Sequence, residues 1–576
     1  MLGYVRKLAM VFALVMVFST QWGFYLPATQ VVHATTKPYE SSVQDKISKV
    51  LSSQNGGPVA SRFLPWQSGT AIAPMHAQAK MLVIAVAFRN QKQEESLQMI
   101  DSLYFAMKNS VASYYRQVSY GQFDLQGNVV GDPLHHGRFL TLPHTESYYA
   151  GLDNGSGSPY PNDDDGIVND AIRLLRKDGF NFQPYVENGQ IPYLSLVFTG
   201  YGADVDPTDA ALVWPVESTL GKMIRVPYMP VLHTVSSGQH QTTMAYANIV
   251  NYDLVPELSD QSGAPSTIGV YAHEFGHLLG LDDLYDTSSS DQAGQGDGPW
   301  SIMAQGNWNG NPQGAQPAEL DPLSRILLGW VKPIVIRESI TGLTIPPIES
   351  SPTVYALMPS GTQKDYFLLD NVEPISDDVA LPGFGLLIWH IDGRMATFTS
   401  PDWVNNVLNS PSQNKTHHDD VMIEEANGSK DLLSPSGEIS PGTDTYPSLA
   451  NNQFTATSKP NNLLWDGQSV GIDLTNISVN SNMVTVDVLD KQSGASLVIQ
   501  RPNKNLNMIR TQRVTLHALY TEGGHTVDVS HEGVFSVMAG GAILHGNVAT
   551  FTQDGTVIIS VFARHLTSLI YLHVMG

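Results

Sequence analysis

The stretch HEFGHLLGLDD, residues 273–283, is the part of this chain around which the rest is organised. On a helix, His273 and His277 lie four residues apart, so both imidazoles project from one face and can hold one metal ion. Glu274 projects beside that face, where it can polarise a water molecule bound to the metal. The stretch therefore predicts a metal-binding helix with a general base next to its ligands.

The residues after the second histidine predict how a third ligand reaches the metal. Gly280 can end the helix in a left-handed conformation. The chain then turns back and brings Asp283 towards the same ion, whereas Asp282 falls one residue short of the required offset. Two imidazoles, one carboxylate and an open fourth position are typical of a catalytic zinc site. The alternative is an ordinary amphipathic helix with histidines at helical spacing.

The composition limits the class of protein. A chain of 576 residues is too long for one core, so we expect about two to four domains. The formal net charge of −23 argues against nucleic acid as a partner, because phosphates require basic side chains, and it leaves carboxylates that can bind calcium. The sequence has no cysteine, which excludes disulfides, thiolate zinc sites and cysteine nucleophiles.

The N-terminal sequence predicts export. Residues 1–34 resemble a signal peptide, with an apolar run at residues 8–18 and Val-His-Ala at residues 32–34. The run is shorter than the ~20 residues that a membrane span requires, although an uncleaved anchor is the alternative. Polar residues 35–79 are either a propeptide or an extended arm. We expect a secreted, extracellular protein without a stable membrane anchor.

Strand and helix patterns alternate ahead of the metal-binding stretch. The predicted strands are 81–88, 123–130 and 193–200, and the predicted helices are 94–119, 167–177 and one that begins near Thr267. Residues 214–252 are interpreted as loops and short strands that line a cleft. Residues 80–335 therefore predict an α/β (α+β) catalytic domain.

A loop between these elements is rich in glycine and aspartate. It contains Asp153-Asn154-Gly155 and, after a gap, Asp163-Asp164-Asp165-Gly166. Clustered carboxylates ahead of a helix can bind a structural calcium ion. Aspartate is also favoured in turns and at helix N-caps on its own account, so that interpretation stays open.

A methionine follows the metal-binding helix in the segment GPWSIMA, residues 298–304. In the metzincins, a superfamily of zinc peptidases, a methionine in a turn packs beneath the metal ligands. We expect Met303 to occupy that structural position below the metal site, although a lone methionine in a turn is often only a gap-filler.

Several further stretches resemble the immune-inhibitor-A-like metallopeptidases of bacteria. Besides the metal-binding helix they are SYYRQVSYG at 113–121, SIM at 301–303, LGW at 328–330 and GFGLLIWHID at 383–392. Together they extend over residues 80–490. The resemblance implies a secreted bacterial zinc endopeptidase with a zincin or metzincin-like catalytic domain, aspartate as the third zinc ligand at Asp283, and structural calcium.

Two features depart from the wider metzincin pattern. Many metzincins have a histidine where this chain has Asp283. Some carry a tyrosine just after the methionine turn, where this chain reads Ala304-Gln305-Gly306.

The remainder of the chain predicts β-sandwich-type domains. Residues 336–490 form a β-rich domain packed on the catalytic core, with strands at 366–370, 385–391, 421–425 and 484–488. Residues 491–576 form a small Ig-like sandwich with about five strands, 496–500, 513–520, 526–529, 533–537 and 557–563. His390, His417 and His418 are interpreted as ordinary surface or core groups outside the site.

The leading functional hypothesis is a secreted zinc endopeptidase that hydrolyses extracellular proteins or peptides. In that hypothesis His273, His277 and Asp283 hold one catalytic zinc ion, and Glu274 activates the water bound to it. The first alternative is a catalytically silent zincin scaffold used for binding or adhesion, and the second is a zinc amidase or deacetylase that acts on cell-wall amides. Glu274 argues against the silent scaffold. The sequence indicates neither cleavage specificity nor oligomeric state.

Overall fold

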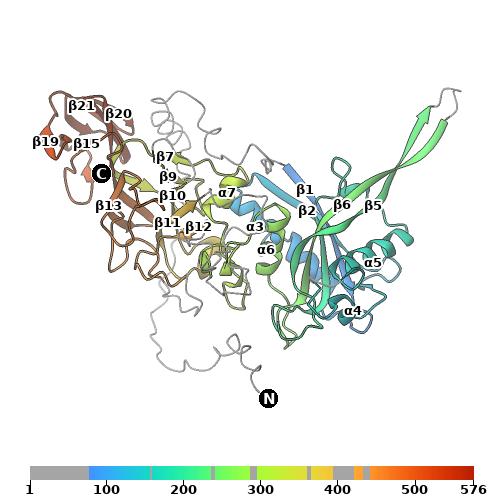
Figure 1. Ribbon diagram of the computed structural model, residues 1–576. Coiled ribbons are helices and arrows are strands. Elements are labelled where there is room, and N and C mark those ends of the chain that lie inside the picture. Colours follow the sequence, from blue (N-terminus) through green and yellow to red (C-terminus); the bar gives the residue numbers. More distant parts are fainter. Residues whose placement is uncertain are drawn as a thin grey trace, which may run out of the picture. The chain divides into compact units, whose positions relative to one another are not determined.

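The computed structural model describes residues 77–155, 159–234, 240–285, 295–359, 365–392, 421–432 and 442–576. The predicted signal peptide and almost all of the predicted N-terminal arm lie outside these residues. The described chain is a mixed α/β structure with several sheets and few helices (Figure 1). No helix among the described residues is long and apolar enough to span a membrane.

The first sheet packs against the predicted metal-binding helix. Its main strands follow the order β2-β1-β4-β6-β5, and β3 pairs with β1. All of these pairings are parallel except that of the edge strand β5, which is antiparallel to β6. The strands are β1 (Ala77–Ala87), β2 (Phe123–Val130), β3 (Leu140–Thr141), β4 (Leu194–Tyr201), β5 (Val216–Thr234) and β6 (His240–Leu258).

Helices cover both faces of this sheet, which explains the continuous apolar run of β1. Alternate side chains of a strand point to opposite faces. Met81, Val83 and Ala85 pack into one core with α2 (Leu97–Phe105), α3 (Val111–Val118) and the metal-binding helix α6 (Ile268–Leu278). Leu82, Ile84 and Val86 pack into a second core with α4 (Glu146–Ala150) and α5 (Asp164–Lys177). The predicted strands 81–88, 123–130 and 193–200 and the predicted helix 167–177 are confirmed.

The predicted helix over residues 94–119 is wrong in one respect, because it is two helices. α2 ends before Ala106, and α3 begins after the N-cap Ser110. The hydroxyl of Ser110 accepts from the amide of Ser113, and the hydroxyl of Ser113 accepts from the amide of Ser110, a reciprocal capping box. Asn109 has a φ of +52°, which interrupts the helix.

The interpretation of residues 214–252 as loops and short strands is also wrong. These residues form most of β5 and β6, two paired strands of 19 residues each. Pro227 and Pro230 interrupt the alternation of the sequence, and the pairing shifts register next to Pro227. Proline is tolerated on an edge strand, where its missing N–H faces away from the neighbouring strand.

The β-rich part begins after α7 (Pro322–Leu327). One sheet has the order β12-β11-β10-β9-β7. Its strands are β7 (Ile334–Val335), β9 (Tyr355–Leu357), β10 (Asp365–Val372), β11 (Gly385–Asp392) and β12 (Val421–Ile423). Trp389 of β11 and Trp330 lie in the same core as Phe275 of α6 and Met303. Segments 320–330 and 385–391 therefore pack on the core that supports the predicted metal-binding helix.

The C-terminal part has more strands than the five predicted. Its largest sheet runs β13-β14-β8-β24-β23-β20, with β16 paired to β24, and two small sheets run β15-β18-β19 and β17-β22-β21. The bounds are β8 (Ser339–Ile345), β13 (Ile472–Asn480), β14 (Met483–Asp490), β15 (Ala495–Ile499), β16 (Asn507–Ile509), β17 (Arg513–Thr515), β18 (Ala518–Glu522), β19 (His525–Asp528), β20 (Val534–Ala539), β21 (Ala542–His545), β22 (Val548–Phe551), β23 (Gly555–Ala563) and β24 (Leu566–Met575). Because β24 pairs in parallel with β8, one sheet joins the predicted domains 336–490 and 491–576.

His390 lies within this β-rich part and not in the metal centre. Its imidazole lies between two carboxylates, with Nδ1 at 2.9 Å from Glu424 and Nε2 at 2.8 Å from Asp365. It stacks on Trp465 with ring centroids 4.6 Å apart. The interpretation of His390 as a satisfied core group is confirmed, while His417 and His418 lie outside the described residues.

Candidate metal centre

The metal-binding stretch lies on α6, which starts after Thr267 as predicted. Two buried tyrosine hydroxyls hold this helix against its neighbours. Tyr271 donates to the carbonyl of Pro256 on β6 at 2.8 Å, and Tyr115 of α3 donates to the carbonyl of Ala272 at 2.6 Å. The histidines that follow therefore project from a helix anchored on two sides.

Helix α6 ends just before Gly280, as predicted from the sequence. Gly280 has a φ of +92°, a left-handed conformation that glycine adopts without a Cβ clash. The amide of Gly280 donates to the carbonyl of His277 at 2.8 Å, and the amide of Leu281 donates to that of Gly276 at 3.1 Å. This turn reverses the chain and brings Asp283 back towards the histidines.

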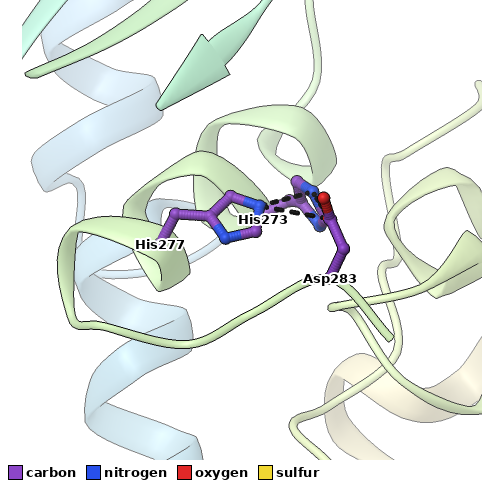
Figure 2. Close-up of side chains that lie close together, drawn as sticks. All are labelled: His273, His277 and Asp283. Atoms are coloured by element: carbon purple, nitrogen blue, oxygen red, sulfur yellow. Dashed lines mark hydrogen bonds and ion pairs between the residues drawn. The ribbon is translucent and has the colours of Figure 1, made fainter. Parts of the chain in front are cut away.

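Three ligand atoms converge at one point (Figure 2). The Nε2 atoms of His273 and His277 are 3.1 Å apart, and Oδ1 of Asp283 lies 3.2 Å from each of them. In a tetrahedral zinc site with metal–ligand distances of about 2.0–2.1 Å, neighbouring ligand atoms are about 3.3–3.4 Å apart. The triangle therefore has nearly the size that one zinc ion requires.

Backbone carbonyls set the orientation of both imidazoles. Nδ1 of His273 lies 2.7 Å from the carbonyl oxygen of Ile302, and Nδ1 of His277 lies 2.8 Å from that of Leu281. A carbonyl only accepts, so each Nδ1 carries the proton and donates it. In neutral imidazoles the lone pairs are then on the two Nε2 atoms, which face the shared point.

The third atom of the triangle also fits a metal. Oδ1 of Asp283 is buried and has no hydrogen-bond partner, an arrangement that is costly without a cation. Burial favours the neutral carboxyl, yet a positive charge on the neighbouring His277 and His273, when they are protonated, holds the pKa of Asp283 well below its usual range. A carboxylate and two imidazole nitrogens are a donor set that zinc prefers. The residues present therefore fit a zinc ion.

Met303 lies against the metal-binding helix. Its side chain is fully buried, and its Sδ would lie 2.6 Å from a Cβ built on Gly276. The carbonyl of Met303 accepts from the amide of Leu284 at 2.8 Å, and the preceding carbonyl, that of Ile302, orients His273. This turn therefore contacts the helix and holds the residue that follows Asp283.

Replacing Gly276 with alanine is expected to destabilise the protein, because the new methyl group would displace Met303 from a packed core. Overpacking of this kind costs about 1–3 kcal/mol. The measurement is urea unfolding of Gly276→Ala, and of the same change in a Met303→Ala background. In that background the cost should shrink, because the atom that clashes is gone. An equal cost in both backgrounds would show that Met303 does not pack against position 276.

Glu274 lies on α6 between the two histidines and is buried. Burial raises the pKa of its carboxyl group, while His273 and His277 lower it. The backbone N–H of Glu217 on the edge strand β5 also hydrogen-bonds this carboxyl group. A carboxylate with a raised pKa beside metal ligands is suited to accept a proton.

Two residues near the centre were not predicted from the sequence. Tyr285 is half-buried and hydrogen-bonds the carboxylate of Asp283, and its ring centroid lies 6.4 Å from that of His273. Because Tyr285 follows Asp283 by only two residues, the sequence could have indicated that it lies near the centre. Glu217 is the second, and burial raises its pKa to about 7 despite the nearby His277. The sequence held no signal for Glu217, because β5 was not recognised as a strand.

The predicted calcium loop shows capping rather than a metal cluster. Asp163 is the N-cap of α5 and accepts from the amide of Gly166, and Asp165 accepts from the amide of Gly221. Burial raises the pKa of Asp164 to about 8. In the described part of the chain, the other cluster with metal-ligand spacing is Glu425, Asp431 and Asp444, outside this loop. The calcium prediction is therefore not supported.

Comparisons with known proteins agree with this geometry. Residues 232–328, which contain α6 and the methionine turn, match the family model of the immune inhibitor A peptidase M6, catalytic domain. The predicted resemblance to the immune inhibitor A family is confirmed. An immune inhibitor A from Bacillus thuringiensis subsp. alesti is 25% identical over 232 residues, which cover 37% of this chain and 30% of that protein.

A second relative is a pre-pro-metalloprotease, PrtV, from Vibrio cholerae serotype O1 (strain M66-2). It is 35% identical over 121 residues, which cover 20% of this chain and 11% of that protein. The alignments thus span less than a third of the length of either relative. The catalytic-domain match and the metalloprotease relative support a metalloendopeptidase, the enzyme class predicted.

Proposed function

We propose that this chain is a zinc-dependent endopeptidase with a zincin-like catalytic region at residues 80–335. The observation that carries the proposal is the convergence of His273, His277 and Asp283, whose ligand atoms lie 3.1 to 3.2 Å apart. The peptidase M6 match over the same residues supports it. These three side chains would hold one zinc ion, and Glu274 would serve as the general base.

A zinc ion bound there would supply a Lewis acid that polarises the peptide carbonyl and acidifies water. Glu274 accepts a proton from the attacking water while the water oxygen bonds to the carbonyl carbon. The same carboxyl group then gives the proton to the amide nitrogen as the C–N bond breaks. The products are a carboxylate and an amine. Tyr285, through its hydrogen bond to Asp283, holds that carboxylate in position.

The edge strand β5 supports a way to bind the substrate. β5 is last in the order of its sheet, and it passes the site at Glu217, whose backbone N–H contacts Glu274. An extended peptide can add to such an edge through main-chain hydrogen bonds. We infer that the scissile segment lies along β5 near Glu217.

The proposal includes export and maturation. Residues 1–34 would be the signal peptide, and residues 35–79 a propeptide. The relative named pre-pro-metalloprotease supports this order of segments. The β-rich regions 336–490 and 491–576, which share one sheet, would complete the protein, and the protease would act on extracellular proteins or peptides.

Hydrolysis of three substrates by the purified protein tests the proposal. Casein and a quenched-fluorescent peptide should be cleaved, a zinc chelator should stop cleavage, and added zinc should restore it. Purified peptidoglycan should stay intact. Cleavage of peptidoglycan amides without cleavage of protein would instead show an amidase. If the protein is trimmed of residues 35–79, contains zinc and still cleaves none of the three substrates, it is a binding scaffold.

A further inference from the structure

The hairpin of β5 and β6 continues beyond the sheet that carries the metal centre (Figure 1). β6 pairs with β4 over residues 253–258, whereas its pairing with β5 continues to His240. We call residues 222–234 and 240–249 the arm. At its base Ile224, Val226 and Ile249 are buried in the second core, so the base of the arm is anchored to the catalytic sheet.

The arm exposes large apolar side chains from its base outward. Met223, Met229, Met244 and Tyr246 are between 40% and 47% exposed. Methionine, tyrosine and arginine are enriched in the cores of protein interfaces, and methionine suits surfaces that bind varied partners. A two-stranded ribbon is also marginally stable alone in water. The exposed side chains therefore indicate a surface that a partner covers.

The charge of the arm differs from that of the rest of the chain. Residues 218–252 contain no Asp or Glu, although the chain has 54 of them and a formal charge of −23. Lys222 and Arg225 are exposed, and the Arg225 guanidinium lies 5.0 Å from the ring centroid of Tyr246. A cationic, apolar surface on an acidic protein complements an acidic polypeptide.

The proline positions indicate how such a partner is recognised. Pro227 pairs with Tyr246 and Pro230 pairs with Met244 on the edge strand β5. Proline has no N–H to donate to an added strand. Along the β5 edge of the arm, strand addition is therefore disfavoured, and recognition there falls to the side chains. Pro215 lies just before β5, and from Val216 to Arg225 the same edge has no proline, so strand addition remains available beside Glu217.

The arm and the metal centre share one strand. Glu217 contacts Glu274, and Met223 and Met229 follow it on β5. At about 3.3 Å per residue, Met223 lies about 20 Å and Met229 about 40 Å along the strand from Glu217. We propose that the arm is an exosite that binds acidic segments of protein substrates outside the scissile sequence. This inference rests on the proposed function.

Two substrates with one scissile sequence test the exosite. One is a quenched octapeptide, which spans about 13 Å on either side of its centre and cannot reach the methionines. The other carries the same eight residues between two 20-residue flanks rich in glutamate and leucine. A third version, with glutamine in place of glutamate, isolates the role of charge. KM and kcat are measured separately for each.

The charge-reversed variant Lys222→Glu/Arg225→Glu should raise KM about tenfold for the acidic-flanked substrate, with kcat nearly unchanged. Its octapeptide kcat/KM should stay native. The matched control Lys504→Glu/Arg513→Glu, which changes the same two residue types at exposed positions, should leave both substrates unaffected. Met244→Ser/Tyr246→Ser should raise KM for the acidic and the glutamine-flanked substrates alike.

Other outcomes would overturn the exosite. Equal losses on the octapeptide and the flanked substrates would indicate a folding defect, and no loss on either would leave the arm without this role. If the native protein is a dimer and the arm variants are monomers, the arm binds a second copy of the chain. If the native protein binds phosphatidylglycerol vesicles and the arm variants do not, the arm binds a lipid surface. If the native protein does not cleave the octapeptide, the proposed function fails. Fluorescence anisotropy of the labelled acidic-flanked peptide then measures its binding to the arm without any cleavage. Equal affinity of the native protein and the arm variants for this peptide would refute the exosite.

Discussion

Replacing Glu274 with glutamine is expected to lower kcat by about 10²–10⁴-fold, the contribution of a general base, while bound zinc stays at the native level. The side chain keeps its shape but can no longer accept the proton of the attacking water. Its position on α6 beside His273 and His277, and the burial that raises its pKa, suit it to this role. Initial rates with a quenched peptide and zinc content by mass spectrometry are the two readouts.

Glu217 provides the comparison for this variant. It is another carboxyl group with a raised pKa close to the site, and it lies on β5 rather than on the metal-binding helix. Glu217→Gln should keep most of the activity. If Glu217→Gln had no peptidase activity and Glu274→Gln remained active, the proton acceptor would have been assigned to the wrong residue.

Replacing Asp283 with alanine is expected to weaken zinc binding by at least about 100-fold, because changes even outside the ligand set cost 10–100-fold. The variant leaves two imidazoles to hold the ion, and activity should fall with the metal. Zinc dissociation constants come from competition with a chromogenic chelator, and thermal unfolding with and without zinc shows the coupling of metal to stability.

Asp282 is the matched control for that measurement. It is the adjacent carboxylate, but it is not part of the converging triangle. Asp282→Ala should retain zinc near the native affinity. Loss of zinc in Asp282→Ala with retention in Asp283→Ala would contradict the ligand assignment and the turn geometry on which it depends.

The local chemistry of the centre was predictable because it is encoded within eleven residues. Helical spacing fixes His273 and His277 on one face, and the left-handed Gly280 fixes the return of Asp283. What the sequence could not show is the support from distant residues. The carbonyl of Ile302 that orients His273 and the N–H of Glu217 that contacts Glu274 come from other parts of the chain.

The β5–β6 hairpin was missed for a physical reason. Pattern reading depends on regular alternation, and Pro227, Pro230 and Gly221 interrupt it. The strands extend through these positions because β5 lies at the sheet edge, where a missing N–H costs no ladder bond. The exposed Met244 and Tyr246 further obscure the pattern, because they occupy positions that a solvent-facing strand would fill with polar residues.

The C-terminal strands show another limit. Individual runs such as 557–563 were predictable from alternation, but their partners were not. β24 pairs in parallel with β8, more than two hundred residues earlier in the chain. Pairing over such a distance leaves no local signal, so the sequence suggested a separate small sandwich where one sheet joins both segments.

Zinc K-edge X-ray absorption of the purified protein tests the central claim most directly. The account predicts one zinc per chain, four-coordinate, with nitrogen and oxygen neighbours at about 2.0–2.2 Å and the multiple-scattering signature of two imidazoles. His273→Ala/His277→Ala should abolish that signal. A protein that binds no zinc, or a zinc signal without imidazole scattering that survives the double substitution, would contradict the claim that these residues form the metal centre.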